Sequence, residues 1–192
     1  MIRSVFVERI SIAIDMDEVL ADTSKKVFQT AKELGLPVSK EELRGKSIWT
    51  TLTKEQLIVL GQAINTAGYF RDLEVIDSAI PVVKELSEHY DIYIATAAME
   101  VPFSFMDKYE WLKEHFPFLD HNYFIFCGNK KVVHADYLID DTVSQLDNFT
   151  GTGILFEAYH NENMKTDHVH VSGWNDVREY FKKVREQSET KI

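Results

Sequence analysis

The sequence predicts an α/β fold in three layers, with a mainly parallel sheet between helices and a small helical insertion after the first strand, and three observations support it. Short apolar runs rich in β-branched or aromatic residues alternate with segments of helical periodicity, which is typical of βαβ units. The length of 192 residues fits one domain, or one domain that carries an insertion. More than seventy residues separate the first two strand-like runs, although a single helix would suffice to connect them.

The strands and helices can be assigned in chain order. Strands are expected at residues 10–14, 92–95, 123–126, 137–139 and 154–156. Helices are expected where apolar residues recur at helical spacing, as in Val27, Ala31 and Leu34; Leu57, Leu60 and Ile64; Phe105, Tyr109 and Leu112; and Val177, Phe181 and Val184. A further helix is predicted near residues 78–88, with Asp77 or Ser78 as its N-cap and Pro81 in its first turn.

Residues 23–75 are predicted to form the insertion. The helix near 78–88 can make the first crossover, which leaves residues 1–22 and 76–192 as the α/β core and 23–75 as a helical cap subdomain. An insertion after the carboxyl end of a strand stands beside the usual ligand crevice of an open α/β sheet. We therefore expect the cap to cover a site.

Composition and charge exclude several classes of function. Apolar residues make up 45% of the chain and charged residues 27%, which is typical of a soluble globular protein. The net charge of −10 argues against binding to a nucleic acid polymer or to a membrane surface. Cys127 is the single cysteine, so no intrachain disulfide can form, which fits a reducing compartment. With no apolar run near the ~20 residues that span a bilayer, we expect a cytoplasmic protein.

Polar side chains follow four of the expected strands or lie close behind them. They occur in "SIAIDMDEVLAD", "IYIATAA", "FIFCGNKKVV" and "YLIDDT", and the candidates are Asp15, Asp17, Thr96, Lys130, Lys131, Asp140 and Asp141. Since the carboxyl ends of parallel strands lie along one edge of a sheet, these groups should converge. Carboxylates from two strands suit Mg²⁺, while a hydroxyl and an ammonium group suit phosphoryl oxygens. The pattern predicts phosphoryl transfer, with an aspartate able to attack phosphorus.

The four signals, in this order, resemble the haloacid dehalogenase (HAD) superfamily of aspartate-nucleophile phosphatases. More closely, "DMDEVLAD", "DKYEWLKEHF" and "NKKVVHADYLIDD" resemble the 5'(3')-deoxyribonucleotidase family, and "GYFRDLEVI" resembles the segment in which its cap rejoins the core. The resemblance implies a Rossmann-like core and a Mg²⁺-dependent phosphomonoesterase. Its expected substrates are deoxyribonucleoside monophosphates, with a pyrimidine preference. Whether the protein forms a homodimer is not decided by the sequence.

The resemblance implies roles for the first acidic pair. Asp15 matches the nucleophile and a Mg²⁺ ligand, and Asp17 matches the general acid and base, with its backbone carbonyl on the metal. Residues at i and i+2 of a strand share a face, so both carboxylates can address one phosphate. Asp17 must carry a proton when the ester oxygen leaves, so we expect surroundings that favour its neutral form.

Four further residues match the family motifs. Thr96 matches the phosphate-binding hydroxyl, and Lys130 fits the phosphate-binding lysine better than its neighbour does. Asp141 matches a direct metal ligand, and Asp140 is expected to act through water or to orient the site.

Two segments depart from the family pattern. Ala97 and Ala98 stand where members of that family carry Ser-Pro, and Gly128 stands where they carry an arginine that contacts the nucleotide. The base preference is therefore open at this point.

Aromatic and polar residues outside the motifs have simpler interpretations. Asp22 is expected to cap the next helix, and Glu18 to be a surface or turn residue. Lys131 is interpreted as solvated, and the strand-face pair His168 and His170 lacks an evident third metal ligand. Three aromatic residues could line a substrate pocket or form cap core, namely Trp49, Tyr69 and Phe70.

Other functions stay open on sequence alone. A HAD phosphatase could act on another small ester, such as a sugar phosphate or phosphoglycolate. A phosphoacceptor signalling module of the receiver type also uses acids, Thr and Lys at sheet ends, but there the acidic pair comes first and the acceptor lies mid-chain. A binding protein without turnover is the third alternative. The complete set of expected chemical groups favours an enzyme.

Overall fold

A parallel sheet organises the molecule. The computed structural model describes residues 9–189, so the first eight and last three residues of the predicted core lie outside it. Within this range, six parallel strands form one sheet in the order β3-β2-β1-β4-β5-β6. The strands are β1 Ser11–Ile14, β2 Asp91–Ala97, β3 Phe124–Cys127, β4 Tyr137–Asp140, β5 Thr152–Phe156 and β6 Val169–Val171.

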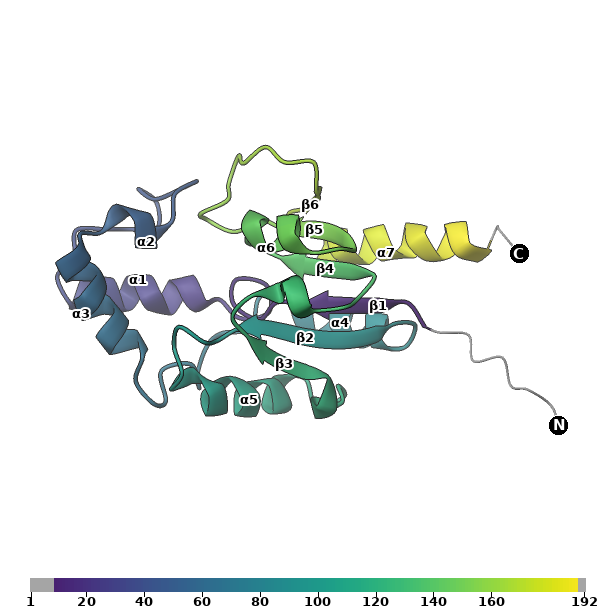
Figure 1. Ribbon diagram of the computed structural model, residues 1–192, viewed down its shortest axis with the longest axis horizontal. Helices are drawn as coiled ribbons and strands as arrows, with labels where there is room; N and C mark the ends of the chain where they lie inside the picture. The colour runs from purple at the N-terminus through teal and green to yellow at the C-terminus, as the bar shows by residue number, and fades with distance from the viewer. Residues whose placement is uncertain (1–8, 190–192) are drawn as a thin grey trace.

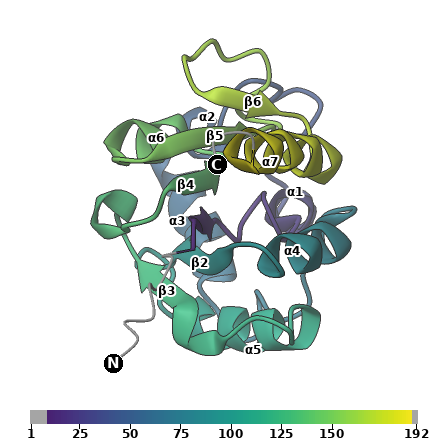
Figure 2. The ribbon, with the colours of Figure 1, turned by 90° about the vertical axis from the view of Figure 1, so that its right-hand side faces the viewer.

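Helices cover both faces of this sheet. The α-helices are α1 Thr23–Glu33, α2 Ile48–Thr51, α3 Lys54–Ile64, α4 Ala79–Ser87, α5 Ser104–His115, α6 Val143–Asn148 and α7 Trp174–Glu189. Two 3-10 helices are present in the described chain, η1 His121–Tyr123 and η2 Lys130–Val132. Figure 2 shows α4 and α7 on one side of the sheet and α6 on the other.

The two faces follow from alternation along the strands. Ile12 and Ile14 of β1 point into the larger core, where they pack with residues of α4, α5 and α7. Ala13 points to the opposite face, into a smaller core that includes Leu146 of α6. The predicted three-layer α/β architecture is therefore confirmed.

Helices α1 to α3 belong to one long connection between β1 and α4, and they lie beyond the carboxyl ends of the strands (Figure 1). The two ends of this connection run side by side. The Asp22 N–H donates to the Glu74 carbonyl at 2.9 Å, and the Ile76 N–H donates to the Leu20 carbonyl at 2.8 Å. The helical segment 23–75 thus leaves and rejoins the rest of the chain at one place.

The strand predictions are confirmed to within two residues at each end, but two local features differ. Strand β6, three residues long, is too short to give an alternation signal and was not among the expected strands. Ser78 is the N-cap residue of α4, yet its side chain makes no capping hydrogen bond and its φ is 62°.

Candidate active site

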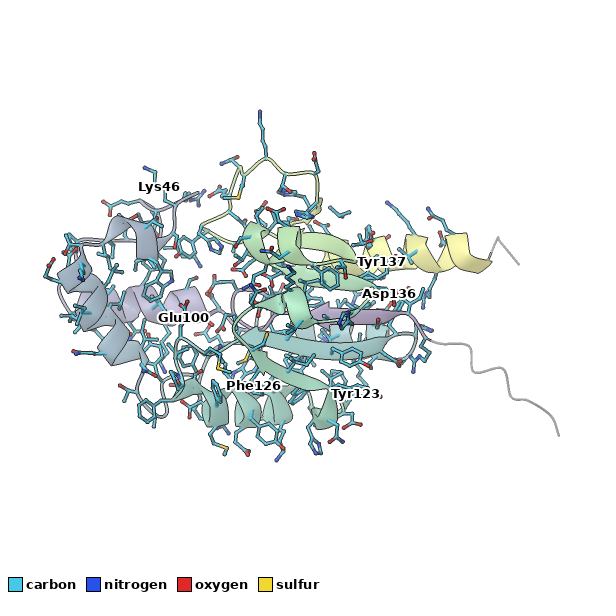
Figure 3. All side chains as sticks on the ribbon, viewed as in Figure 1. Lys46, Glu100, Tyr123, Phe126, Asp136 and Tyr137 are labelled. Carbon is cyan, nitrogen blue, oxygen red and sulfur yellow. The ribbon has the colours of Figure 1, made fainter. Side chains whose placement is uncertain are left out.

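The carboxyl ends of β1, β2 and β4 bring the predicted site residues together. These strands are neighbours in the sheet, so Asp15, Thr96 and Asp140 reach the same edge. Figure 3 shows Tyr123 and Asp136, which precede β3 and β4, at the opposite end of the sheet from Glu100, which follows β2. The helical segment lies on the Glu100 side. Five of the predicted site residues are buried, namely Asp15, Thr96, Lys130, Asp140 and Asp141.

Lys130 holds the first aspartate and the acidic pair together. Its Nζ lies 2.8 Å from Asp15 Oδ1 and also hydrogen-bonds Asp140 Oδ2. The Lys130 N–H donates to Gln145 Oε1 at 3.0 Å, which fixes the short turn that carries the lysine. Burial alone would lower the pKa of Lys130, but the charges of Asp15 and Asp140 raise it. The ammonium group is therefore charged, and its burial is tolerated because both carboxylates pair with it.

Three carboxylates form a cluster that could hold a metal ion. Asp15, Asp140 and Asp141 each offer an oxygen, and these atoms lie within 4.8 Å of one another. Burial, together with repulsion from Asp140 and Asp17, raises the pKa of Asp15 to about 7. Burial and the neighbouring acids also raise the pKa of Asp141 well above its usual value. A hard divalent cation would relieve this crowding, since it prefers carboxylate oxygens.

Lys108 is a site residue that the sequence analysis missed. It lies in α5 and is fully buried, with Nζ 2.5 Å from Asp17 Oδ2 and 3.0 Å from Thr96 Oγ1. The Thr23 hydroxyl donates to the other oxygen of Asp17 at 2.7 Å. The available signal was the motif "DKYEWLKEHF", in which Lys108 stands one turn before the buried Trp111 and Leu112. The sequence analysis identified the buried face of this helix from its apolar residues alone, and such a search does not find a buried lysine.

This contact corrects the expectation that Asp17 favours its neutral form. Burial opposes ionisation of Asp17, but the charge and hydrogen bond of Lys108, with help from Thr23, outweigh it and lower the pKa of Asp17. The pKa values of the two aspartates still differ, as expected for close carboxylates, but Asp15 and not Asp17 has the higher pKa. Without substrate, Asp17 is the ionised member and Asp15 the one that resists ionisation.

Two residues after β5 brace Asp141. Asn161 is buried, and its side-chain amide donates to the Asp141 carbonyl and the Phe156 carbonyl, both at 2.8 Å. His160 Nε2 lies 3.2 Å from the Asp141 carbonyl oxygen and 3.3 Å from Asp141 Oδ2. Burial lowers the pKa of His160, so the ring is neutral near pH 7. Partners of this kind orient a ligand and tune a metal site.

Comparison with known proteins decides the family. Residues 8–187 match the model of the family described as "5' nucleotidase, deoxy (Pyrimidine), cytosolic type C protein". The chain belongs to this family. A Bacillus subtilis protein named 5'(3')-deoxyribonucleotidase is 37% identical over 168 residues, which are 86% of this chain and 95% of that protein. A Staphylococcus epidermidis protein named "Putative 5'(3')-deoxyribonucleotidase" is 51% identical over 174 residues, which are 90% and 96% of the two chains.

The predicted resemblance is therefore confirmed, and the chain is a phosphoric monoester hydrolase of the 5'(3')-deoxyribonucleotidase type. Solved structures support the HAD-like fold. A haloacid dehalogenase-like hydrolase from Streptococcus pneumoniae has a TM-score of 0.64 at 19% identity, covering 90% of this chain and 98% of its own. YfnB from Bacillus subtilis, solved bound to magnesium, has a TM-score of 0.57 at 14% identity with the same coverage. None of the helices within residues 9–189 has the length and hydropathy of a membrane span.

The other acids after β1 cap a helix in this nucleotidase-family chain. Asp22 Oδ1 accepts from the Lys25 N–H at 3.1 Å, so the predicted N-cap of α1 is confirmed. Glu18 adopts a φ of 60° in the tight turn, and its carboxylate accepts from the Ser24 N–H at 2.5 Å. Glu18 is therefore a turn residue, as expected, but its carboxylate is partly buried against α1 and not on the open surface.

Two of the three aromatic pocket candidates lie together, since the rings of Tyr69 and Phe70 pack edge to face with their centroids 5.3 Å apart. Trp49 of α2 is about half exposed, whereas Phe70 is buried with its ring against Lys108. The Tyr69 hydroxyl lies 2.8 Å from Thr30 Oγ1 within the helical segment.

Two further candidates lie outside the site. Lys131 is exposed, and His168 pairs with Asp147 at 2.8 Å.

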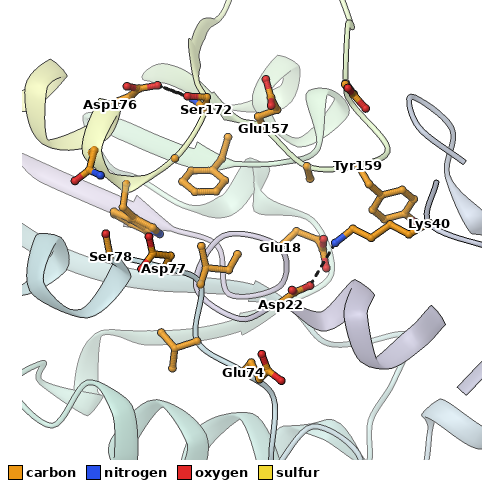
Figure 4. Close-up of a pocket in the computed structure, with 18 of the residues that line it drawn as sticks. Glu18, Asp22, Lys40, Glu74, Asp77, Ser78, Glu157, Tyr159, Ser172 and Asp176 are labelled. Atoms are coloured by element: carbon orange, nitrogen blue, oxygen red, sulfur yellow. Dashed lines mark hydrogen bonds and ion pairs between the residues drawn. The ribbon is translucent and has the colours of Figure 1, made fainter. Parts of the chain in front are cut away.

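A large cavity borders the turn that follows β1. Figure 4 shows it between Glu18, Asp22 and Lys40 on one side and Glu157 and Asp176 on the other. Its volume is about 990 Å³, and carboxylates outnumber cations along its wall. Among the described residues, its lining includes no member of the buried cluster around Lys130. The cavity is thus ill suited to a phosphate group and is separate from the candidate active site.

Proposed function

We propose that this protein is a Mg²⁺-dependent phosphomonoesterase that removes phosphate from deoxyribonucleoside monophosphates, with a preference for pyrimidine bases. One observation carries the proposal. Asp15, Thr96, Lys130 and the acidic pair converge in one buried cluster, in a chain 37% identical to a named 5'(3')-deoxyribonucleotidase. The family description supports the pyrimidine preference.

Mg²⁺ would be held mainly by Asp15 and Asp141, with the backbone carbonyl of Asp17 as a further ligand. Three crowded carboxylates fit a hard cation, and the raised pKa values of Asp15 and Asp141 indicate negative charge that needs compensation. Asp140 suits an orienting role, because its Oδ2 bonds Lys130 and its Oδ1 accepts from the Thr142 N–H. When bound, the ion supplies positive charge that neutralises the carboxylates and polarises a phosphoryl oxygen.

Thr96 and Lys130 hold the phosphoryl group in this proposal. The Lys130 ammonium group contacts Asp15 directly, and the Thr96 hydroxyl shares the Lys108 ammonium group with Asp17, so both can meet the charge that builds on the phosphoryl oxygens. The Ala98 N–H donates to the Cys127 carbonyl at 3.0 Å, so it is not available as a further donor. The missing second hydroxyl at Ala97 is therefore not replaced by the amide of Ala98.

The chemical step uses the two aspartates in turn. Within the described residues, Asp15 Oδ1 is engaged by Lys130 and the Met16 N–H, which leaves Oδ2 to attack phosphorus. The ester P–O bond breaks, and the leaving oxygen takes a proton from Asp17. Asp17 then takes a proton from the water that attacks the aspartyl-phosphate, which releases phosphate and restores Asp15. The negative charge of the arriving substrate favours protonation of Asp17, which its contact with Lys108 otherwise opposes.

The helical segment 23–75 acts as the cap in this proposal. It stands beyond the carboxyl edge of the sheet and joins the core through two adjacent connections (Figure 1). This placement would cover a bound nucleotide and shield the aspartyl-phosphate from stray water.

The test is phosphate release from a panel of nucleoside monophosphates, each with Mg²⁺ and with a chelator. Deoxyribonucleotides, above all those of pyrimidines, should be hydrolysed best, and chelation should abolish turnover. Equal activity on nucleotides, sugar phosphates and phosphoglycolate would contradict the substrate assignment. Activity that survives chelation would contradict the metal site.

A further inference from the structure

We propose that Asp107 is a positioning residue that ties the cap to the proton-transfer site. It fixes residues 68–70, where the cap rejoins the core, and thereby keeps Lys108 against Asp17 and Thr96. The inference rests on the proposed function, because it concerns the step in which Asp17 handles the proton.

The Asp107 carboxylate binds residues 68–70, the junction at which the cap rejoins the core. Its Oδ2 accepts from the Gly68 N–H at 2.7 Å and from the Phe70 N–H at 3.3 Å. An acid in the first turn of a helix usually interacts with the N–H groups of its own helix. Here the carboxylate binds the backbone of a segment 37 to 39 residues away in the sequence.

Lys108, the next residue in α5, contacts the side chain of the same segment. Its Nζ lies 5.0 Å from the centre of the Phe70 ring, and both side chains are buried. The same Nζ makes the contacts with Asp17 and Thr96 described above. The Phe70 ring is therefore one wall of the small chamber that holds the ammonium group, and its cation–π contact helps to compensate burial of the charge.

Asp107 is the anchor that keeps this wall in place from the core side. Two other hydrogen bonds of the junction run to α1 and so stay within the cap: Lys26 donates to the Tyr69 carbonyl at 2.6 Å, and the Tyr69 hydroxyl contacts Thr30. Farther along the segment, α5 makes two more links: the Trp111 indole N–H donates to the Leu73 carbonyl at 2.8 Å, and Arg71 pairs with Glu114 in an exposed ion pair that contributes little. Asp107 is the α5 residue that hydrogen-bonds residues 68–70 themselves.

Loss of the Asp107 anchor should loosen the junction while the cap remains folded. The Phe70 ring would then shift, and Lys108, a long flexible side chain, would no longer be confined to one position. Its hydrogen bond to Asp17 would be disordered, so the acid would be poorly aimed at the leaving oxygen. The predicted defect is in turnover and not in substrate binding.

The test compares Asp107→Ala and Asp107→Asn with the matched control Glu114→Gln. Each variant of the full chain is assayed with Mg²⁺ on the best deoxyribonucleotide and on p-nitrophenyl phosphate. The Asp107→Ala change should lower kcat on the nucleotide about tenfold or more, with KM within about twofold. The loss should be smaller on p-nitrophenyl phosphate, whose leaving group departs without a proton. Asp107→Asn, which keeps an acceptor oxygen, should be intermediate.

Several outcomes would overturn the inference. They are wild-type kcat in Asp107→Ala, a defect confined to KM, equal losses on both substrates, or the same losses in Glu114→Gln. Thermal unfolding of every variant checks that the fold is retained. A wild-type protein that releases no phosphate from nucleotides overturns the proposed function instead. In that case the variants are compared on p-nitrophenyl phosphate and on an alkyl phosphate that the wild type hydrolyses.

Discussion

Lys108 Nζ lies 2.5 Å from Asp17 Oδ2, and this contact sets the charge of the proposed acid. The lysine is fully buried, whereas the Asp17 side chain is 27% exposed. A fully buried ammonium group depends on its partner more than a partly exposed carboxylate does. The pair therefore orders Asp17 in the free protein, and the proton needed for catalysis must arrive together with the substrate.

Replacing this lysine should impair turnover more than folding. In Lys108→Met the ammonium group is lost from Asp17 and Thr96, so we expect kcat to fall about 100-fold. The apolar side chain fits the buried position, so the melting temperature should change little. The matched control is Lys113→Met on the same helix, whose side chain is 47% exposed and should leave kcat unchanged. Full activity in Lys108→Met would contradict a role of Lys108 in turnover.

The covalent mechanism predicts that Asp15→Asn abolishes turnover and spares the fold. An amide cannot form the aspartyl-phosphate, so kcat should fall by about 10⁴-fold or more. Burial raises the pKa of Asp15 to about 7, so a neutral side chain suits the site. We therefore expect metal-free Asp15→Asn to melt at or above the wild-type temperature at pH 8. Residual phosphate release near the wild-type rate would exclude Asp15 as the nucleophile.

The sequence was sufficient to predict those site residues that lie at the carboxyl ends of the strands. Asp15, Thr96 and Asp140 follow directly from the rule that parallel strands end along one edge. Lys130 needed the family motif as well, because it lies in a turn three residues after β3 ends.

Contacts between elements far apart in the chain could not be predicted. Lys108 meets Asp17 across 91 residues, and Asn161 meets Asp141 across 20, through the packing of a helix and a loop against the sheet. Neither contact follows from local periodicity. The reversed ionisation of Asp17 follows from the first of them, so it was also beyond sequence reasoning.

Asn161 should matter for stability and for the metal site. In Asn161→Ala the Asp141 and Phe156 carbonyls lose a donor, and the Ala158 N–H loses an acceptor at 2.9 Å. We expect the free energy of unfolding to fall by about 2 kcal/mol, since buried polar groups are left without partners. Mg²⁺ affinity, measured by calorimetry, should fall about tenfold or more, because Asp141 is less well oriented. Asn148→Ala, at an exposed asparagine of α6, is the control and should change neither quantity.

Stability of the metal-free protein should fall as pH rises from about 4 to about 7. The unfolded chain releases the Asp15 proton near 3.8, whereas burial raises the pKa of Asp15 to about 7 in the fold. Between these values the folded state binds more protons, so the free energy of unfolding decreases with pH. His160, whose pKa burial lowers, acts in the opposite direction as pH falls through about 6.5.

The Asp15 contribution can be isolated with Asp15→Asn and with Mg²⁺. Denaturant unfolding with a chelator should show a steeper fall with pH in the wild type than in Asp15→Asn, because the amide does not titrate. Mg²⁺ at 100 times its dissociation constant should add about 2.7 kcal/mol at pH 7. It should add less at pH 5, where protons compete for the carboxylates. Wild-type and Asp15→Asn curves of equal slope would show that Asp15 ionises normally in the fold, and the crowding that motivates the metal site would then be absent.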